Sequence, residues 1–206
     1  MTDRPDSPGL PRQITKGEET REKILKEAVE LFSEHGFAKA STRQLVGRLG
    51  MTSSAIYNHF ANKDEILFTI IQRAGDKVVV TLQDAIEQYD DPVECLKRMI
   101  TGMLYLFRAG AIRKEIAIFI DELYQLPEDL RQLCNKQHRR IFDLFVDKIL
   151  ESEKGDRIRP INRVVATFGI LGAMLWVYHW FRDDGSLTIE EIADEVIKLL
   201  FNGLLK

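Results

Sequence analysis

The sequence predicts an all-α protein, and two observations carry that prediction. Apolar side chains recur three and four positions apart along most of the 206 residues, which is the spacing of one helix face. No convincing stretch alternates apolar and polar residues with the period of two that marks a strand. Clusters of glycine, proline and aspartate interrupt the pattern at intervals. We therefore expect nine helices, near residues 18–35, 42–49, 53–59, 63–89, 92–109, 112–125, 127–153, 161–182 and 188–204.

Residues 1–17 precede the first periodic segment and are expected to form a disordered arm. Three prolines stand among Asp, Arg, Ser and Gly residues there, and no apolar run of the kind found in a secretion signal is present. A flexible tail is the simpler interpretation, but three basic residues could reach the minor groove of DNA: Arg4, Arg12 and Lys16.

The first expected helix runs from about Glu18 to His35 and carries an apolar stripe on one side. Gly36 should end it, because a glycine readily adopts the positive φ that follows many helices. Phe37 can then fold back onto Phe32. This helix should pack on the next two and complete a small three-helix core.

The segment from Ser41 to Lys63 predicts two short helices joined by a tight turn, which is the pattern of a helix-turn-helix. Ser41 and Gln44 have the spacing of a capping box, and Gly50 supplies the turn. Thr52 is placed to cap the second helix, whose residues Ile56 and Phe60 would point inward.

The outer face of this segment has chemistry that suits DNA. Between Lys39 and Lys63 there is no Asp or Glu and there are four Lys or Arg residues, although the whole chain has 32 acidic and 29 basic residues. A carboxylate here would repel the phosphate backbone, so DNA binding explains the gap. An ordinary pair of core helices with a chance gap in acids is the alternative. We expect one set of residues to contact phosphates, namely Thr42, Thr52, Tyr57, His59 and Lys63. A second set should approach bases, namely Arg43, Ser53, Ser54, Ala55 and Asn58.

Residues 164–181 form an uncharged apolar run of nearly membrane-span length. The run contains Tyr178 and His179 and stands alone in an amphipathic chain, so we favour a helix buried on two sides over a membrane span. One side would face its own chain and the other a second copy, giving a homodimer with a four-helix interface. The expected interface residues are Ala166, Gly169, Gly172, Ala173, Ile192, Val196, Leu199 and Leu200.

Residues Thr52 to Leu67 resemble the recognition helix and following helix of the tetracycline-repressor (TetR) family. The resemblance lies in Tyr57, His59, Phe60, Lys63 and Leu67, and it extends over about residues 20 to 70. It implies a nine-helix fold with a DNA-binding domain at residues 18–62 and a ligand-binding and dimerisation domain at residues 63–206. It also implies double-stranded operator DNA, a small-molecule effector and a second copy of the chain as partners.

The family's second domain usually encloses an effector pocket, and flexible or aromatic residues of this chain fall on helices that must converge. The candidates are Met103, Phe107, Phe119, Leu123, Phe142, Phe145, Phe168, Met174 and Trp176. Residue by residue, a plain packed core is the better explanation, so the case for a pocket rests mainly on the family resemblance.

One short stretch resembles a branch of the family that regulates fatty-acid and steroid breakdown in response to acyl-CoA thioesters. It consists of Trp176-x-Tyr178-x-Trp180-Phe181-Arg182 followed by Gly185-x-Leu187-Thr188. An acyl chain would need an apolar tunnel and the CoA phosphates would need cations. Arginines are available for the phosphates, although they also suit solvated helix ends: Arg139, Arg140, Arg157, Arg159 and Arg163.

A helical enzyme and a structural interaction protein without sequence-specific DNA binding are the contrasting hypotheses. The structural protein does not explain the segment without acidic residues, and no motif supports the enzyme. No glycine-rich phosphate loop, nucleophile elbow or HExxH motif is present, and the four histidines are scattered. We therefore expect no catalytic residue, no metal and no cofactor. Cys95 and Cys134 lack metal-ligand spacing and are expected to be buried, reduced thiols of a cytoplasmic protein.

Overall fold

The computed structural model describes residues 15–108 and 110–203, and within them it contains helices and no strand. The nine α-helices of this part of the chain are α1 Lys16–His35, α2 Thr42–Leu49, α3 Ser53–Tyr57, α4 Lys63–Gln88, α5 Pro92–Tyr105, α6 Ala111–Asp121, α7 Glu128–Lys154, α8 Arg163–Trp180 and α9 Ile189–Asn202. A short 3-10 helix, η1 Leu123–Gln125, follows α6. Most of the expected arm, including Arg4 and Arg12, lies outside the described residues.

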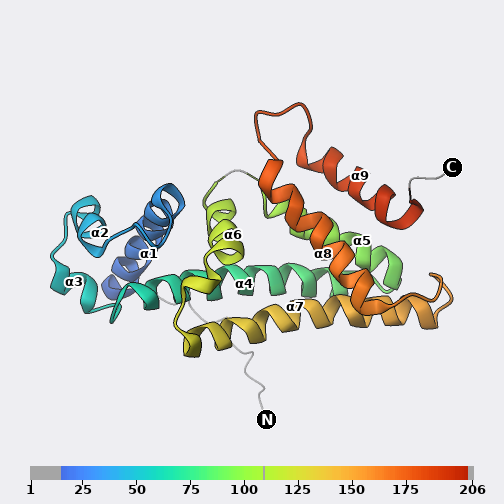
Figure 1. Ribbon diagram of the computed structural model, residues 1–206, viewed down its shortest axis with the longest axis horizontal. Helices are drawn as coiled ribbons and strands as arrows, with labels where there is room; N and C mark the ends of the chain where they lie inside the picture. The colour runs from blue at the N-terminus through green and yellow to red at the C-terminus, as the bar shows by residue number, and fades with distance from the viewer. Residues whose placement is uncertain (1–14, 109, 204–206) are drawn as a thin grey trace, which may run out of the picture.

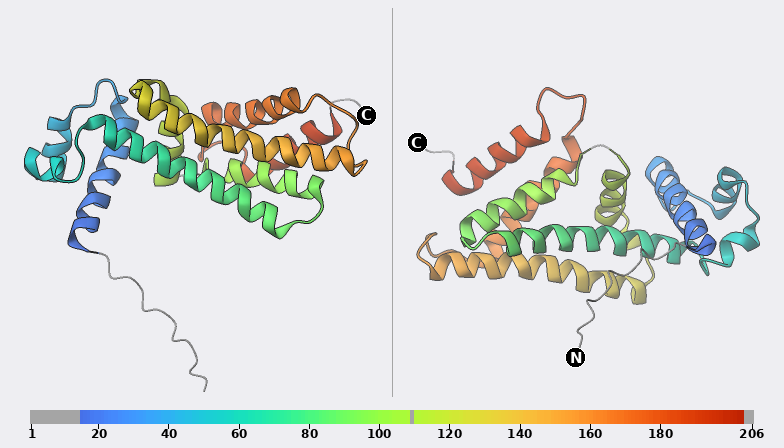
Figure 2. Two further views of the ribbon diagram at one scale, coloured as in Figure 1. Left: turned by 90° about the horizontal axis from the view of Figure 1, so that it is seen from below. Right: turned by 180° about the vertical axis from the view of Figure 1, so that it is seen from behind.

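The molecule is elongated, and α4 runs along its middle (Figure 1). Helices α1, α2 and α3 gather at one end, whereas α5, α8 and α9 lie toward the other (Figures 1 and 2). Helix α7 lies beside α4, and α6 stands across α4 next to α1. Because α4 passes from one half to the other without a break, the two halves share a stiff element.

Many helix boundaries follow from local capping, and several differ from expectation. Helix α1 starts at Lys16 rather than Glu18, because Thr15 and Glu18 form a capping box that was not expected. Helix α5 ends at Tyr105, where the chain tightens into bonds three residues apart such as Phe107 N to Leu104 O at 2.9 Å. Helix α3 ends at Tyr57 rather than His59, and α6 gives way to η1.

A single apolar core extends from the α1–α3 end through α4 to the far end. The turn after α1 closes as expected, since the Phe32 and Phe37 rings meet edge to face with centroids 5.2 Å apart. Cys95 and Cys134 are both buried and unpaired. Burial in apolar surroundings raises the pKa of both thiols. No helix of the described residues is long and apolar enough to cross a membrane.

Helices α4 and α5 approach each other closely at Gly102. A Cβ placed on Gly102 would lie 2.7 Å from Thr81 Cγ2, well inside van der Waals contact. The Thr81 hydroxyl donates to the Lys77 carbonyl at 2.9 Å, which fixes the rotamer that aims Cγ2 at the glycine. The packing distance between the two helices therefore depends on the missing side chain.

Gly102→Ala should destabilise the protein by about 1–2 kcal/mol, because overpacking outweighs the roughly 1 kcal/mol gain in helix propensity. In a Thr81→Ser background, which lacks Cγ2, the same substitution should be neutral or stabilising. Urea unfolding followed by circular dichroism measures all four proteins. An equal cost of Gly102→Ala in both backgrounds would contradict this explanation.

Candidate nucleic-acid interface

Helix α2 is built by its caps. The Ser41 hydroxyl accepts a hydrogen bond from the Gln44 amide at 3.2 Å, and the Gln44 side chain accepts one from the Ser41 amide at 2.8 Å. At the other end Gly50 adopts the left-handed conformation with φ 61° and ψ 29°. Leu45 and Leu49 are buried, so the opposite face of the helix is presented to solvent.

Helix α3 is short and turns its polar side outward. The Thr52 hydroxyl caps it by accepting from the Ala55 amide at 3.2 Å. Ile56 and Phe60 are buried, and Phe60 also supports the Arg21 guanidinium 4.6 Å from its ring centre. This anchoring leaves an exposed surface at the end of the molecule (Figure 1), to which Ser53, Ser54, Tyr57 and Asn58 belong, while Thr42, Ala55 and His59 are half-buried.

The cations of the segment differ in what they contact. The Arg48 guanidinium pairs with two carboxylates of α1, Glu34 and Glu27 at 2.5 and 3.4 Å. These contacts raise the pKa of Arg48 and lower that of Glu34. Lys39 and Arg43 are exposed and have no ion-pair or hydrogen-bond partner among the described residues. Two positive charges of this surface are therefore available to an external anion.

Contrary to the expectation, Lys63 does not point outward to contact a phosphate. Its ammonium donates to the main-chain carbonyls of Phe37 and Ala40 at 2.6 and 2.7 Å, and it lies 4.0 Å from the centre of the Phe37 ring. Burial lowers the pKa of Lys63. Sequence spacing could not reveal this, because the carbonyls that it binds belong to the turn after α1.

The expected effector residues separate into two groups. Six are buried in the core: Met103, Phe107, Phe119, Leu123, Phe145 and Met174. Phe142 is half-buried and packs against Phe168, with ring centroids 5.0 Å apart. Phe168 and Trp176 are 62% and 68% exposed on the outer face of α8, so they do not line an internal pocket of this chain. Helix α8 is apolar all round, and its sequence period cannot tell which face turns inward.

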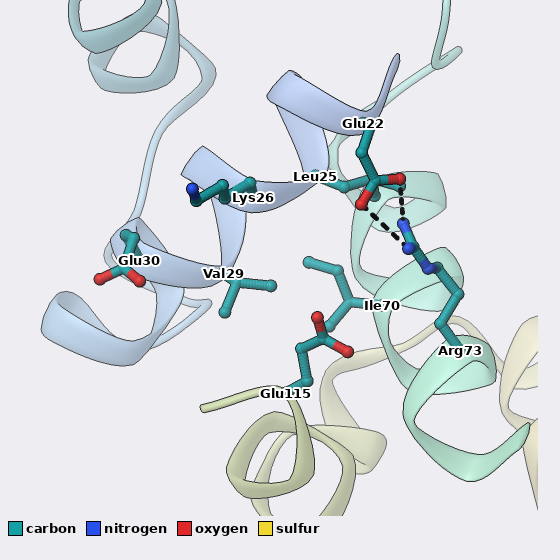
Figure 3. Close-up of a pocket in the computed structure, with 8 residues that line it drawn as sticks. All are labelled: Glu22, Leu25, Lys26, Val29, Glu30, Ile70, Arg73 and Glu115. Atoms are coloured by element: carbon teal, nitrogen blue, oxygen red, sulfur yellow. Dashed lines mark hydrogen bonds and ion pairs between the residues drawn. The ribbon is translucent and has the colours of Figure 1, made fainter. Parts of the chain in front are cut away.

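Two openings stand out in the described part of the chain, and neither is lined by the expected effector residues. A small one of about 120 Å³ lies between α1, α4 and α6 (Figure 3). Its floor is apolar, and Glu22 bonds to Arg73 across its rim at 2.7 and 3.0 Å. A wider cleft of about 530 Å³ lies between α1, α6 and the end of α8. Its lining is Ser33, Gly110, Arg113, Lys114, Ala117, Tyr178, His179 and Asp183. Of these, only Tyr178 and His179 stood out in the sequence, because no motif connects the other positions.

The residues expected at a dimer interface also separate. Gly169 and Gly172 are exposed on α8, and a Cβ on either would meet no atom within 4 Å. Ala166 and Ala173 are half-buried beside them, and Leu199 is exposed on α9. The prediction that Ile192 lies at the interface was wrong, because this residue is buried in the core of its own chain. Val196 and Leu200 are half-buried against the same core.

Two protein-family models match this chain. The model described as "Bacterial regulatory proteins, tetR family" matches residues 24–70, and the one described as "Tetracyclin repressor-like, C-terminal domain" matches residues 89–204. The HTH-type transcriptional repressor KstR2 of Mycobacterium tuberculosis strain H37Rv is 24% identical over 191 residues, which cover 90% of this chain and 93% of that protein.

Solved structures agree with these matches. AibR in complex with isovaleryl coenzyme A and operator DNA is 28% identical, with a TM-score of 0.83 over 88% of this chain and 98% of that one. PfmR from Thermus thermophilus is 26% identical, with a TM-score of 0.82 over 89% of this chain and all of that one. One family model thus matches the α1–α3 end, and the other matches more than half of the chain, from the end of α4 onward. The chain belongs to the TetR family of transcriptional regulators.

Proposed function

We propose that this chain is a dimeric repressor that binds a near-palindromic operator and releases it when an acyl-CoA binds. The observation that carries the DNA-binding part is the exposed face of α2 and α3, which has no carboxylate and presents small polar side chains at the tip of the molecule. Residues 18–62 would form the DNA-binding unit and residues 63–206 the effector and dimerisation unit. Membership in a family of regulators argues against an enzyme.

The exposed side chains suit two kinds of contact. Thr42, Thr52, Tyr57 and His59 can donate to phosphate oxygens and set the position of the protein on DNA. A second group lies where base edges would be reached, and it consists of Arg43, Ser53, Ser54, Ala55 and Asn58. Arg43 has the chemistry for a bidentate contact to guanine and Asn58 for one to adenine.

The outer face of α8 supports the dimer. Val165, Phe168 and Trp176 are large apolar side chains exposed to solvent, and the two glycines between them leave room for a second helix. Such a patch is unusual on a monomer and marks an interaction surface. Helix α8 lies toward the end of α4 remote from α3 (Figure 2), so a dimer through α8 and α9 would hold two α3 helices apart for successive major grooves.

An acyl-CoA effector is supported by the relatives and by the core. AibR, which is 28% identical, was solved with isovaleryl coenzyme A and operator DNA. The core contains flexible Met103 and Met174, which adapt readily to an inserted acyl chain. Thr167 Oγ1 and Gln137 Oε1 are buried without a hydrogen-bond partner in the described part of the chain, so each could pair with a polar group of a ligand. The buried candidates pack against one another, so an acyl chain inserted among them would have to displace packed side chains, which lowers its apparent affinity.

Release can then follow from geometry. With 26 residues at about 1.5 Å each, α4 is a lever of about 39 Å. A tilt of about 5° would move its tip by roughly 3 Å, enough to take a recognition helix out of register with its groove. Ligand causes this only through its preference for the tilted state, which typically amounts to about 1–3 kcal/mol.

The effector proposal predicts that a long-chain acyl-CoA weakens operator binding. Fluorescence anisotropy would be measured on DNA from upstream of the chain's own gene and on a randomised pool, with the thioester, with CoA alone and with the free fatty acid. Salt-dependent, selective binding released only by the thioester is expected. Selective binding that the thioester leaves unchanged would remove the effector proposal, and the absence of selective binding would remove the repressor proposal.

Arg43 and Arg48 provide a charge-matched pair of variants. Arg43→Ala should weaken binding to the selected operator by about 1–3 kcal/mol and relax preference at one base step. Arg48→Ala removes the same charge but should weaken binding much less, since its guanidinium is held by Glu34 and Glu27. Titrations against the operator and single-base variants measure both effects. An equal loss from the two variants at every sequence would mean that only net charge matters here.

Trp176→Glu should convert the dimer to a monomer, because it replaces the most exposed large apolar side chain of α8 with a charge. Val80→Glu is the control, since Val80 is an apolar side chain with comparable exposure, 54%, on α4. Sedimentation velocity and thermal unfolding would be measured for both. Dissociation by Trp176→Glu alone, with the helical content unchanged, is expected; a Trp176→Glu protein that remains dimeric would place the interface elsewhere.

A further inference from the structure

Glu122 connects the two halves of the molecule by a hydrogen bond to the main chain. Its Oε1 accepts from the amide of Phe37 at 3.0 Å, although the two residues are 85 positions apart. Glu122 follows the last residue of α6, whereas Phe37 lies in the turn between α1 and α2. Helices α1 and α6 stand side by side at this point (Figure 1). A carboxylate of the effector half thus holds the turn that leads into the DNA-binding helices.

The same turn is held from a second direction by Lys63. Its ammonium binds the carbonyls of Phe37 and Ala40, and Ala40 directly precedes Ser41, the N-cap of α2. Glu122 also favours the charged form of Lys63 and so opposes the effect of burial, which lowers the pKa of that lysine. Glu122 and Lys63 together therefore fix where α2 begins relative to α4.

The residue before Glu122 makes a contact on the other side. Asp121 Oδ2 accepts from the Tyr178 hydroxyl of α8 at 2.8 Å. Burial and this bond to Asp121 raise the pKa of Tyr178, so the hydroxyl stays a donor at neutral pH. Tyr178 lines the wide cleft beside Arg113 and His179. Its ring packs against that of the buried Phe107, with ring centroids 5.9 Å apart. Tyr178 therefore borders both the cleft and the aromatic core behind it.

Other contacts between α1 and α6 are less suited to carry a signal. Lys114 pairs with Glu30, but both side chains are partly exposed and salt screens such pairs. The bond from Glu122 is charge-assisted, directional and made to the backbone itself. A shift at the end of α6 cannot leave this bond unchanged.

We propose that Glu122 is a positioning residue for DNA binding, and that the hydrogen bond between Tyr178 and Asp121 controls it. While Tyr178 holds Asp121, Glu122 holds Phe37 and α2 stays in the DNA-binding position. Occupancy of the cleft or core that turns Tyr178 away frees the end of α6 and releases the turn. This inference rests on the proposed repressor function, because DNA affinity is one of its readouts.

The first test compares Glu122→Ala, Glu122→Gln and Gln125→Ala. Gln125 is an exposed neighbour in η1 with no side-chain hydrogen bond or ion pair among the described residues, so its variant is the control. Glu122→Ala should weaken operator binding roughly tenfold without effector, within the usual range of coupling between sites. Glu122→Gln keeps an acceptor oxygen and should stay within about threefold of the parent protein. Hydrogen exchange at the Phe37 amide, measured without DNA, should accelerate in Glu122→Ala alone.

The second test uses Tyr178→Phe, which removes the hydroxyl and keeps the ring on Phe107. It should weaken operator binding and accelerate exchange at Phe37, a residue that Tyr178 does not contact. Combined with Glu122→Ala it should add little, because both act through one path. Tyr178→Phe also serves if Glu122→Ala fails to fold.

The outcomes separate the two proposals. Unchanged exchange at Phe37 in Tyr178→Phe, or effects of the two substitutions that simply add, would overturn the relay. Faster exchange at Phe37 in a protein that shows no selective DNA binding would support the relay while removing the repressor function. Loss of operator affinity with unchanged exchange would mean that Glu122 acts on DNA in some other way, and would overturn its positioning role.

Discussion

The two hydrogen bonds from Lys63 to the carbonyls of Phe37 and Ala40 set the geometry on which the rest of the molecule depends. They join the first residue of α4 to the turn between α1 and α2, so the lever and the DNA-binding helices meet at one lysine. Because α4 continues unbroken into the other half, it fixes the orientation of α2 and α3 relative to helices α5 to α9. A rotation of α4 is thereby passed to the exposed surface instead of being absorbed by a flexible linker.

Two of the four basic side chains between residues 39 and 63 are paired within the protein and are not available to DNA. Lys63 binds carbonyls and Arg48 binds carboxylates of α1, which leaves Lys39 and Arg43 for an external anion. One copy of such a surface would bind DNA weakly, because each phosphate contact adds only a modest increment. Pairing two copies is the physical route to a useful affinity, and the exposed apolar face of α8 is the contact that we propose for it.

The opposite half combines a packed core with buried groups that are incompletely satisfied. The aromatic and methionine side chains expected to form a pocket fill the space between helices, while Thr167 Oγ1 and Gln137 Oε1 lack partners among the described residues. In the proposed mechanism, a ligand that enters this core displaces packed side chains. Under that proposal, the displacement couples the binding energy of the ligand to a movement of α6 and α4.

Local features could be predicted from the sequence alone because their causes lie within a few residues. The helical class, the caps at Ser41 and Thr52 and the left-handed Gly50 follow from side chains and backbone preferences within one turn. Contacts between distant segments could not be predicted in this way. The sequence suggested an outward Lys63, an inward Phe168 and an intersubunit Ile192, and packing reversed all three. Which face of α8 turns inward, and which carbonyls a lysine meets, depends on neighbours brought together from tens of residues away. Helical periodicity determined that a face exists, and only the tertiary structure decided what covers it, because burial is a property of the assembled surface.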